Sequence, residues 1–108
     1  MVVKSDGSRE DFDKEKLLRG LRISCAKRPV PAERINELAD LIEKRLQMQG
    51  NYEVYSRQIG DMVIAGLKNL DLIAYIRFAI VYLQMDDLHS VRNEIDKLLA
   101  ENDNSAVN

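Results

Sequence analysis

Residues 2–17 read VVKSDGSREDFDKEKL and differ in pattern from the rest of this 108-residue chain. Two short extended runs, 2–4 and 9–12, flank the pair Asp6-Gly7, which is typical of tight hairpin turns because glycine tolerates a positive φ. Asp13 then stands where a helix N-cap is expected, ahead of leucines at helical spacing. The stretch predicts a β-hairpin that leads into a first helix. An isolated hairpin is only marginally stable in water, so we expect it to pack on helices or on a partner.

The remainder of the sequence predicts helices separated by short breaks. Proline and glycine mark the breaks, and Ser56 and Asp71 are suited to cap the third and fourth helices. The fourth helix is apolar on nearly every side, which places it at the centre of the core or against another subunit. We expect helices from Asp13 to near Arg28, from Pro31 to Gly50, from Ser56 to Leu70, from Leu72 to Met85 and from Asp87 to Leu99.

The predicted fold class is mostly α, with a small N-terminal β-hairpin packed on a bundle of four to five helices. Residues 52–55 alternate briefly and are expected to form a short extended linker. Residues 1–100 are expected to form one domain, and the polar residues 101–108 a disordered tail.

Composition argues against several classes of function. The net charge is −2, from 16 basic and 18 acidic side chains, so there is no electrostatic footprint for nucleic acid. One cysteine, Cys25, and one histidine, His89, cannot form a disulfide or a Cys/His zinc site within one chain. No segment has the length and apolarity of a membrane span, and the N-terminus lacks a signal-peptide core. We expect a cytoplasmic protein with no membrane partner and no protein metal site, in which Cys25 is a buried thiol.

Catalytic motifs are also missing from the sequence. Neither the Walker-type nor the Rossmann-type glycine pattern occurs, and no carboxylate pair forms a recognisable acid–base dyad. The sequence predicts that this chain is not an enzyme.

The hairpin region nevertheless carries a cluster that could bind phosphate. Lys4, Arg9, Lys14 and Lys16 lie close in sequence, and the start of a helix adds amide donors and a positive dipole end. Lys4 and Glu10 lie on opposite strands, where a basic and an acidic group could bind different parts of one ligand. Val2, Val3 and Phe12 could supply an apolar wall for a base. The alternative is a solvated, charged hairpin, which the spacing alone favours.

Arg77 lies within the apolar segment 72–82, which is an unusual place for a charge. A buried guanidinium needs partners, because an unpaired one costs several kcal/mol. Two interpretations have equal weight: an internal salt bridge to a carboxylate of this domain, or a contact with a ligand or another subunit. Tyr75 and Tyr82 are expected to be core aromatics with their hydroxyls at the rim.

Four segments together resemble a known family. The first is residues 2–17, and the others are CAKRPV at 25–30, SRQIG at 56–60 and LDLIAYIRFA at 70–79. They resemble the ATP-cone, and most closely the cone of the bacterial NrdR repressors of ribonucleotide reductase genes. The resemblance runs from Val2 to about Leu99.

The resemblance implies a site for ATP or dATP between the hairpin and the helices, with Mg²⁺ able to accompany the triphosphate. In relatives, the positions of Val2 and Val3 border the base, and those of Lys4 and Lys16 meet phosphate. Glu10 would contact the sugar or base side, and Ser56 starts the helix that closes the site. Arg9 and Tyr75 complete the implied set. Ser5 departs from the pattern, since many cones carry a second basic residue there, and this removes one expected phosphate contact.

The resemblance also implies a function and a partner domain. Repressors of this family carry an N-terminal zinc ribbon with four cysteines that binds DNA. We therefore expect DNA binding only through such a ribbon, which is absent from these residues. The resemblance also implies that the chain is either an excised domain or a stand-alone cone. The leading prediction is a regulatory domain in which adenine nucleotides control a homo-oligomer. The alternatives are the allosteric cone of a ribonucleotide reductase large subunit and a structural oligomerisation domain without ligand. A nucleotide hydrolase is a further alternative, which the lack of metal ligands and of a base disfavours.

Overall fold

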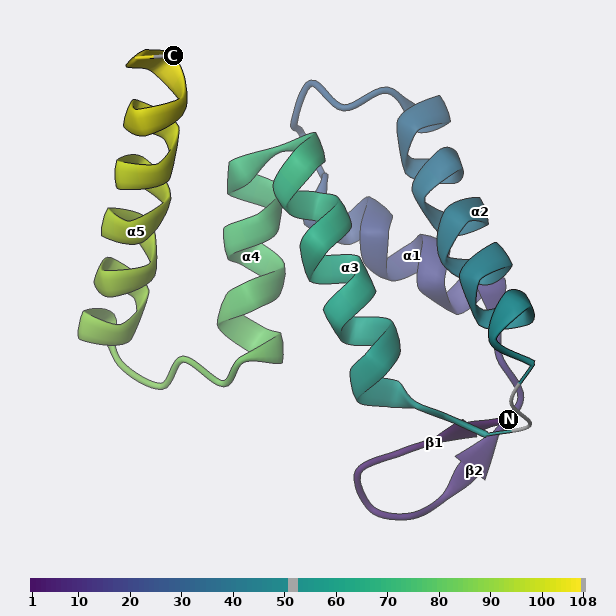
Figure 1. The fold of residues 1–108 in the computed structure, drawn as a ribbon. Coiled ribbons are helices and arrows are strands. Elements are labelled where there is room, and N and C mark those ends of the chain that lie inside the picture. The colour runs from purple at the N-terminus through teal and green to yellow at the C-terminus, as the bar shows by residue number, and fades with distance from the viewer. Residues whose placement is uncertain (51–52, 108) are drawn as a thin grey trace.

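The structure, a computed structural model, describes residues 1–50 and 53–107. It is mostly helical, with a small sheet beside the chain's N-terminus, so the predicted fold class is confirmed (Figure 1). Its elements are β1 (Val2–Val3), β2 (Arg9–Glu10), α1 (Lys14–Ser24), α2 (Ala32–Gln49), β3 (Val54–Tyr55), α3 (Ser56–Leu70), α4 (Leu72–Tyr82) and α5 (Leu88–Val107). Within the described residues, no helix is both long and apolar enough to cross a membrane.

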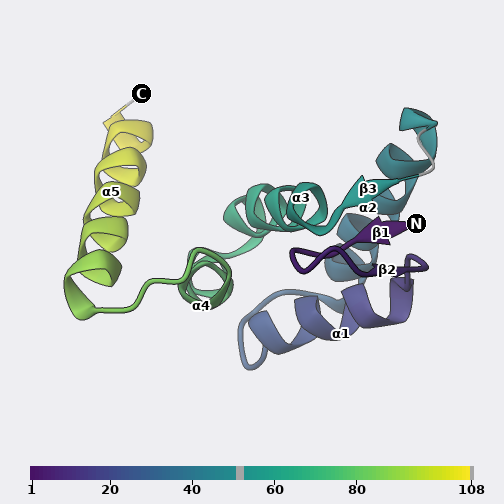
Figure 2. The same cartoon turned by 90° about the horizontal axis from the view of Figure 1, so that it is seen from below.

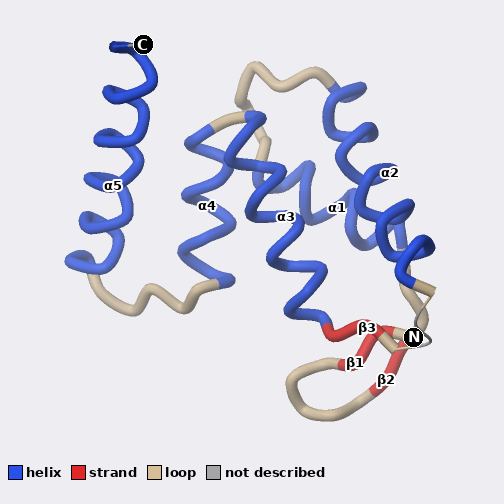
Figure 3. The backbone as a smooth tube through the Cα atoms, in the orientation of Figure 1, coloured by secondary structure: helices blue, strands red, loops and turns tan. Residues whose placement is uncertain are grey.

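The predicted hairpin is present, and it has a third strand that the sequence did not predict. Gly7 has a φ of 87°, and the turn is closed by a hydrogen bond from the Lys4 amide to the Ser8 carbonyl at 2.8 Å. β1 pairs antiparallel with β2 and parallel with β3, giving the strand order β2-β1-β3 (Figure 3). The extended linker expected at 52–55 is therefore a sheet strand at Val54–Tyr55, while Asn51 and Tyr52 lie outside the described residues.

Two of the predicted helix caps are confirmed. The Asp13 carboxylate accepts a hydrogen bond from the Lys16 amide at 3.2 Å, and the Asp71 carboxylate accepts one from the Ala74 amide at 2.9 Å. Gly50 ends α2 with a φ of 67°, as expected for a left-handed C-cap.

Two other caps differ by one residue from the prediction. Ser56 is the first residue of α3 and not its N-cap, because the strand β3 runs directly into the helix and leaves Tyr55 at the cap. There the Tyr55 amide donates to the Gln58 side chain at 3.0 Å. Pro31 is the N-cap of α2 and not its first helical residue.

The ends of three helices also differ from the prediction. α1 ends at Ser24 and not near Arg28, since Lys27 adopts a φ of 61° and turns the chain. α4 ends at Tyr82, ahead of Gln84 with a φ of 53°. α5 continues to Val107, beyond the expected end at Leu99, and Lys68 of α3 forms an ion pair with Glu101 of α5 at 2.8 Å.

The core lies among α1, α2, α3 and α4. Leu21, Ile42 and Leu67, one each from α1, α2 and α3, are its largest fully buried side chains. Gly66 of α3 lies against the Leu38 side chain, so α2 and α3 approach closely at this glycine. α5 packs on α4 at the edge of the bundle, far from the sheet (Figure 2).

Candidate functional site

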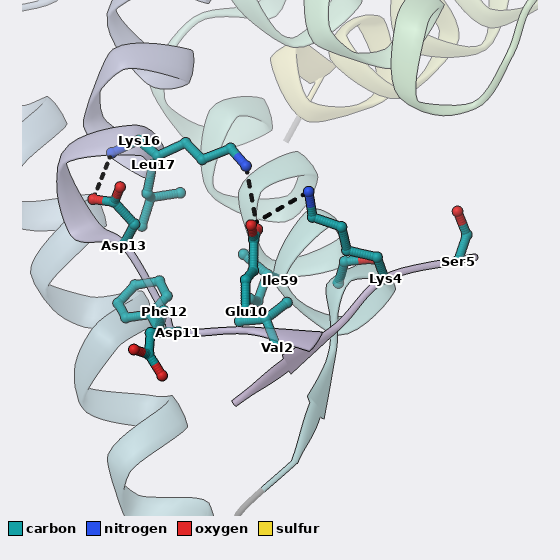
Figure 4. A pocket seen from close by; sticks show the side chains of 11 residues that line it. Val2, Lys4, Ser5, Glu10, Asp11, Phe12, Asp13, Lys16, Leu17 and Ile59 are labelled. Carbon is teal, nitrogen blue, oxygen red and sulfur yellow. Dashed lines mark hydrogen bonds and ion pairs between the residues drawn. The ribbon is translucent and has the colours of Figure 1, made fainter. Parts of the chain in front are cut away.

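A cavity of about 350 Å³ opens beside the hairpin, where the sheet meets the first turns of α1 and α3. The strands and the loop after β2 supply one side, and the two helix starts supply the other (Figure 4). It is lined by Val2, Lys4, Ser5, Glu10, Asp11, Phe12, Asp13, Lys16, Leu17, Ser56 and Ile59.

The polar part of this cavity is built around Glu10. One carboxylate oxygen of Glu10 lies 3.3 Å from Lys4 Nζ and the other lies 3.2 Å from Lys16 Nζ (Figure 4). The hydrogen bonds from Lys16 and then Lys4 hold the pKa of Glu10 below its ordinary value. The three side chains come from β2, from the residue after β1 and from α1, so the hairpin and α1 are joined by charge at the mouth of the cavity.

The apolar part of the cavity is formed by Val2, Phe12, Leu17 and Ile59. Val2 is 7% exposed, so its side chain forms a fixed wall. Such a wall beside converging polar groups is the usual composition of a small-molecule site. The α1 N-terminus also lies here, because Asp13, Lys16 and Leu17 line the cavity, and helix N-termini favour anions.

Five of the eight nucleotide-site residues implied by the sequence meet at this cavity: Val2, Lys4, Glu10, Lys16 and Ser56. The other three do not line it. Val3 is buried in the sheet, and Arg9 pairs with Glu53 at 2.6 Å. Tyr75 is 5% exposed in the core.

Tyr75 has a structural partner on α5. Its hydroxyl donates to a Glu94 carboxylate oxygen at 2.7 Å, which ties α4 to α5. Burial, followed by this hydrogen bond to Glu94, raises the pKa of Tyr75 to about 12. The tyrosine therefore stays protonated and acts as a donor. The expectation of a core aromatic is met by this buried ring, and its hydroxyl reaches Glu94 at the junction of α4 and α5.

Arg77 has a partner that neither interpretation of the sequence foresaw. Its guanidinium is exposed and donates to two backbone carbonyls at the end of α1, Ser24 O at 3.2 Å and Ala26 O at 2.6 Å. The contact is internal, but the partner is the C-terminal end of a helix and not a carboxylate. The helix dipole favours a cation at this end. An arginine in an apolar segment pairs here without being buried.

Cavity residues that the sequence did not single out for the site are Asp11, Asp13, Leu17 and Ile59. Leu17 and Ile59 follow the apolar period of their helices, which is also the pattern of core residues, and Asp13 caps α1. No local pattern separates an apolar residue at the edge of a cavity from one in the core, so the sequence held no signal for them.

Comparison with known proteins now identifies the family. The family model of the ATP cone domain matches residues 1–88. This chain belongs to the ATP-cone family. The resemblance seen in the sequence is confirmed.

Relatives of this ATP-cone are named Transcriptional repressor NrdR. The protein of that name from Acetivibrio thermocellus is 50% identical over 94% of this chain and 67% of its own length. Those from Desulforamulus reducens and Thermoanaerobacter pseudethanolicus are 48% and 44% identical, over 92% and 95% of this chain and 63% and 65% of their own lengths. The chain therefore spans about two thirds of the length of these relatives.

The segments that carry the family resemblance fall into two groups in this ATP-cone. Residues 2–17 and 56–60 contribute side chains to the cavity. Residues 25–30 and 70–79 instead meet at the far end of α1, where Arg28 forms an ion pair with Asp71 at 3.0 Å and Arg77 binds the α1 carbonyls. The second group fixes the position of α1, whose opposite end carries Lys16.

Proposed function

We propose that this ATP-cone is a nucleotide-sensing regulatory domain that binds ATP or dATP in the cavity between the hairpin and the starts of α1 and α3. The observation that carries the proposal is the convergence of Lys4 and Lys16, 12 positions apart in sequence, on one side of a cavity with an apolar wall. Its volume of about 350 Å³ lies within the roughly 300–1,000 Å³ of small-molecule sites. In this proposal the lysines meet the polyphosphate, Val2 and its apolar neighbours border the base, Glu10 contacts the sugar or base side, and Ser56 closes the site.

The charge of the cavity supports a triphosphate that arrives with its own cation. The lining includes two lysines, Lys4 and Lys16, and three carboxylates, Glu10, Asp11 and Asp13, so its formal charge is −1. Within residues 1–50 and 53–107, no cluster of three or more His, Cys, Asp or Glu side chains is placed to hold a metal ion. We therefore expect Mg²⁺ to enter as the nucleotide complex, where it offsets the repulsion between the phosphates and these carboxylates.

The regulatory output in this proposal is a change of homo-oligomeric state. The α4–α5 side of the domain supports it, because six large apolar side chains there are at least 40% exposed: Ile73, Val81, Leu83, Leu88, Ile95 and Leu99. We expect some of these side chains to be covered by another subunit in the assembly. For the switch to work, ATP and dATP must bind the two assemblies with different affinities, since equal affinities shift nothing. In this proposal the switch acts in transcriptional repression, which the name of the relatives supports, and DNA is not bound by the residues of this domain.

A structural domain without ligand is the second candidate, and one observation favours it. Glu10 already forms ion pairs with both cavity lysines, as expected for a charged hairpin that needs no phosphate. Nucleotide binding separates the two candidates.

Calorimetric titration with ATP, dATP and a pyrimidine triphosphate tests the proposal. We expect the adenine nucleotides to bind at least ten-fold more tightly, a difference of about 1.4 kcal/mol. Lys4→Ala and Lys16→Ala should each weaken triphosphate binding by roughly 1.5–3 kcal/mol, the range for hydrogen bonds to charged groups. Lys97→Ala, which removes an exposed lysine on α5, is the matched control and should leave binding unchanged. Absence of heat with both adenine nucleotides would contradict the proposal.

A further inference from the structure

The position of Glu10 has a consequence for how the cavity takes up anions. Each of its two carboxylate oxygens is paired with a different lysine, Oε2 with Lys4 and Oε1 with Lys16. These lysines are the only cationic side chains among the described residues that line the cavity. Each lysine of the cavity therefore has an anionic oxygen as a partner, and the two lysines share the single negative charge of Glu10.

A carboxylate in this position is chemically similar to a phosphate edge. Both groups present two anionic oxygens to ammonium donors, and lysine binds either as a point charge. An incoming phosphate must therefore displace Glu10 from at least one lysine, or share that lysine with a second negative charge. The three side chains are between 40% and 57% exposed, so they can rearrange without opening the core.

We propose that Glu10 is a built-in anionic competitor that holds Lys4 and Lys16 together in the empty cavity and lowers the affinity of the site for phosphate groups. The proposal rests on the proposed function and deepens it, since it assigns Glu10 a role in the empty state beside any contact with a bound nucleoside. Displacement of Glu10 also breaks the charge link between β2 and α1. Phosphate binding is in this way coupled to how firmly the hairpin is held on the helix.

The test uses inorganic tripolyphosphate, which has no sugar or base for Glu10 to contact. Glu10→Gln keeps the size of the side chain and removes its charge. We expect it to bind tripolyphosphate about 10-fold more tightly than the wild type, the upper range for the loss of two exposed ion pairs. Adenosine, which has no phosphate, should gain nothing from the same substitution.

Glu53→Gln is the matched control. Glu53 pairs with Arg9, which is adjacent to Glu10 in sequence, but it does not line the cavity, and its substitution changes the net charge by the same amount. We expect its affinity for tripolyphosphate to stay within about two-fold of the wild type, because Glu53 pairs with Arg9 and not with a cavity lysine, and salt screens its exposed charge. A gain equal to that of Glu10→Gln would assign the effect to net charge and overturn the proposal.

The remaining outcomes of the tripolyphosphate titration also support or overturn the competitor role of Glu10. Unchanged or weaker tripolyphosphate binding by folded Glu10→Gln overturns the competitor role, and so does the absence of binding by both proteins. Binding detectable only with Glu10→Gln supports it. ATP titrated into the wild type in parallel separates the two proposals, since retained ATP binding leaves the proposed function standing when the competitor role fails.

Discussion

Gly60→Ala should destabilise this domain, although alanine is the better helix former. Gly60 lies in α3, where a Cβ would stand 2.6 Å from the Tyr82 hydroxyl oxygen and closer still to two carbons of its ring. Real Cβ atoms do not make such contacts, so the Tyr82 ring must move. Glycine at this position is therefore required by the close approach of α4 to α3.

The size of the effect follows from what Tyr82 loses. Its hydroxyl donates to Arg57 O at 2.8 Å and lies 3.1 Å from an Asp61 carboxylate oxygen, and its ring stacks on Phe78 with centroids 5.4 Å apart. Each hydrogen bond contributes about 0.5–1.5 kcal/mol, and the aromatic pair contributes a similar amount. Alanine returns about 1 kcal/mol of helix propensity. We expect a net loss of about 2 kcal/mol.

The assay is thermal and denaturant unfolding of Gly60→Ala beside Gly20→Ala. Gly20 lies inside α1, and a Cβ there would meet nothing within 4 Å, so this control isolates helix propensity. It should gain about 0.5–1 kcal/mol. A loss of 2 kcal/mol in Gly60→Ala corresponds to a Tm lowered by roughly 8–16 °C in a domain of this size. Gly60→Ala as stable as Gly20→Ala would refute the contact with Tyr82.

Three further predictions concern α4 and its surroundings. Arg77→Ala should lower the unfolding free energy by about 1 kcal/mol, because the α1 carbonyls lose a cationic donor. An unchanged Tm with an altered assembly would instead place the partner of Arg77 in another subunit. Burial raises the pKa of Asp71, but the Ala74 amide and the Arg28 guanidinium together hold it below its ordinary value. The stability that the Asp71 carboxylate contributes is therefore present above pH 3.8 and is lost as the pH falls through the lower pKa of the folded state. Asp71→Asn should flatten this dependence of the unfolding free energy on acid pH, measured by denaturant titration. An unaltered pH profile would contradict this prediction. Light scattering should show that the protein self-associates and that its assembly differs between ATP and dATP. Leu88→Asp, which replaces an 85% exposed leucine, should reduce this self-association. A monomer in every condition would exclude the α4–α5 interface.

The segments predicted well from the sequence are those whose signals are local. The Asp6-Gly7 turn, the Asp13 and Asp71 caps and the Gly50 C-cap each depend on hydrogen bonds or dihedral angles within a few residues, so a short stretch of sequence specifies them. The mostly α class follows from the same local patterns. The four family segments added what spacing alone did not, the expectation of a site between hairpin and helices.

Tertiary structure decided the features that join distant parts of the chain. The sequence predicts a linker and not a strand at β3, because the pairing of β3 with β1 bridges about fifty residues and a two-residue strand has no pattern of its own. Ile59 belongs to the cavity only because α3 starts beside the hairpin. Likewise, Arg77 is satisfied by carbonyls that become available only where α1 ends.

The sequence by itself thus determined which helices form and where most of them start, and it placed Lys4, Glu10 and Lys16 close together along the chain. Only the folded chain determined that both oxygens of Glu10 face the two lysines, and that Arg9 and Tyr75 are paired elsewhere, with Glu53 and Glu94. The physical reason is that caps and turns are set by neighbours in sequence. The partner of a charged or hydroxyl group, in contrast, is set by which side chains packing brings within hydrogen-bonding distance, and that depends on the whole core.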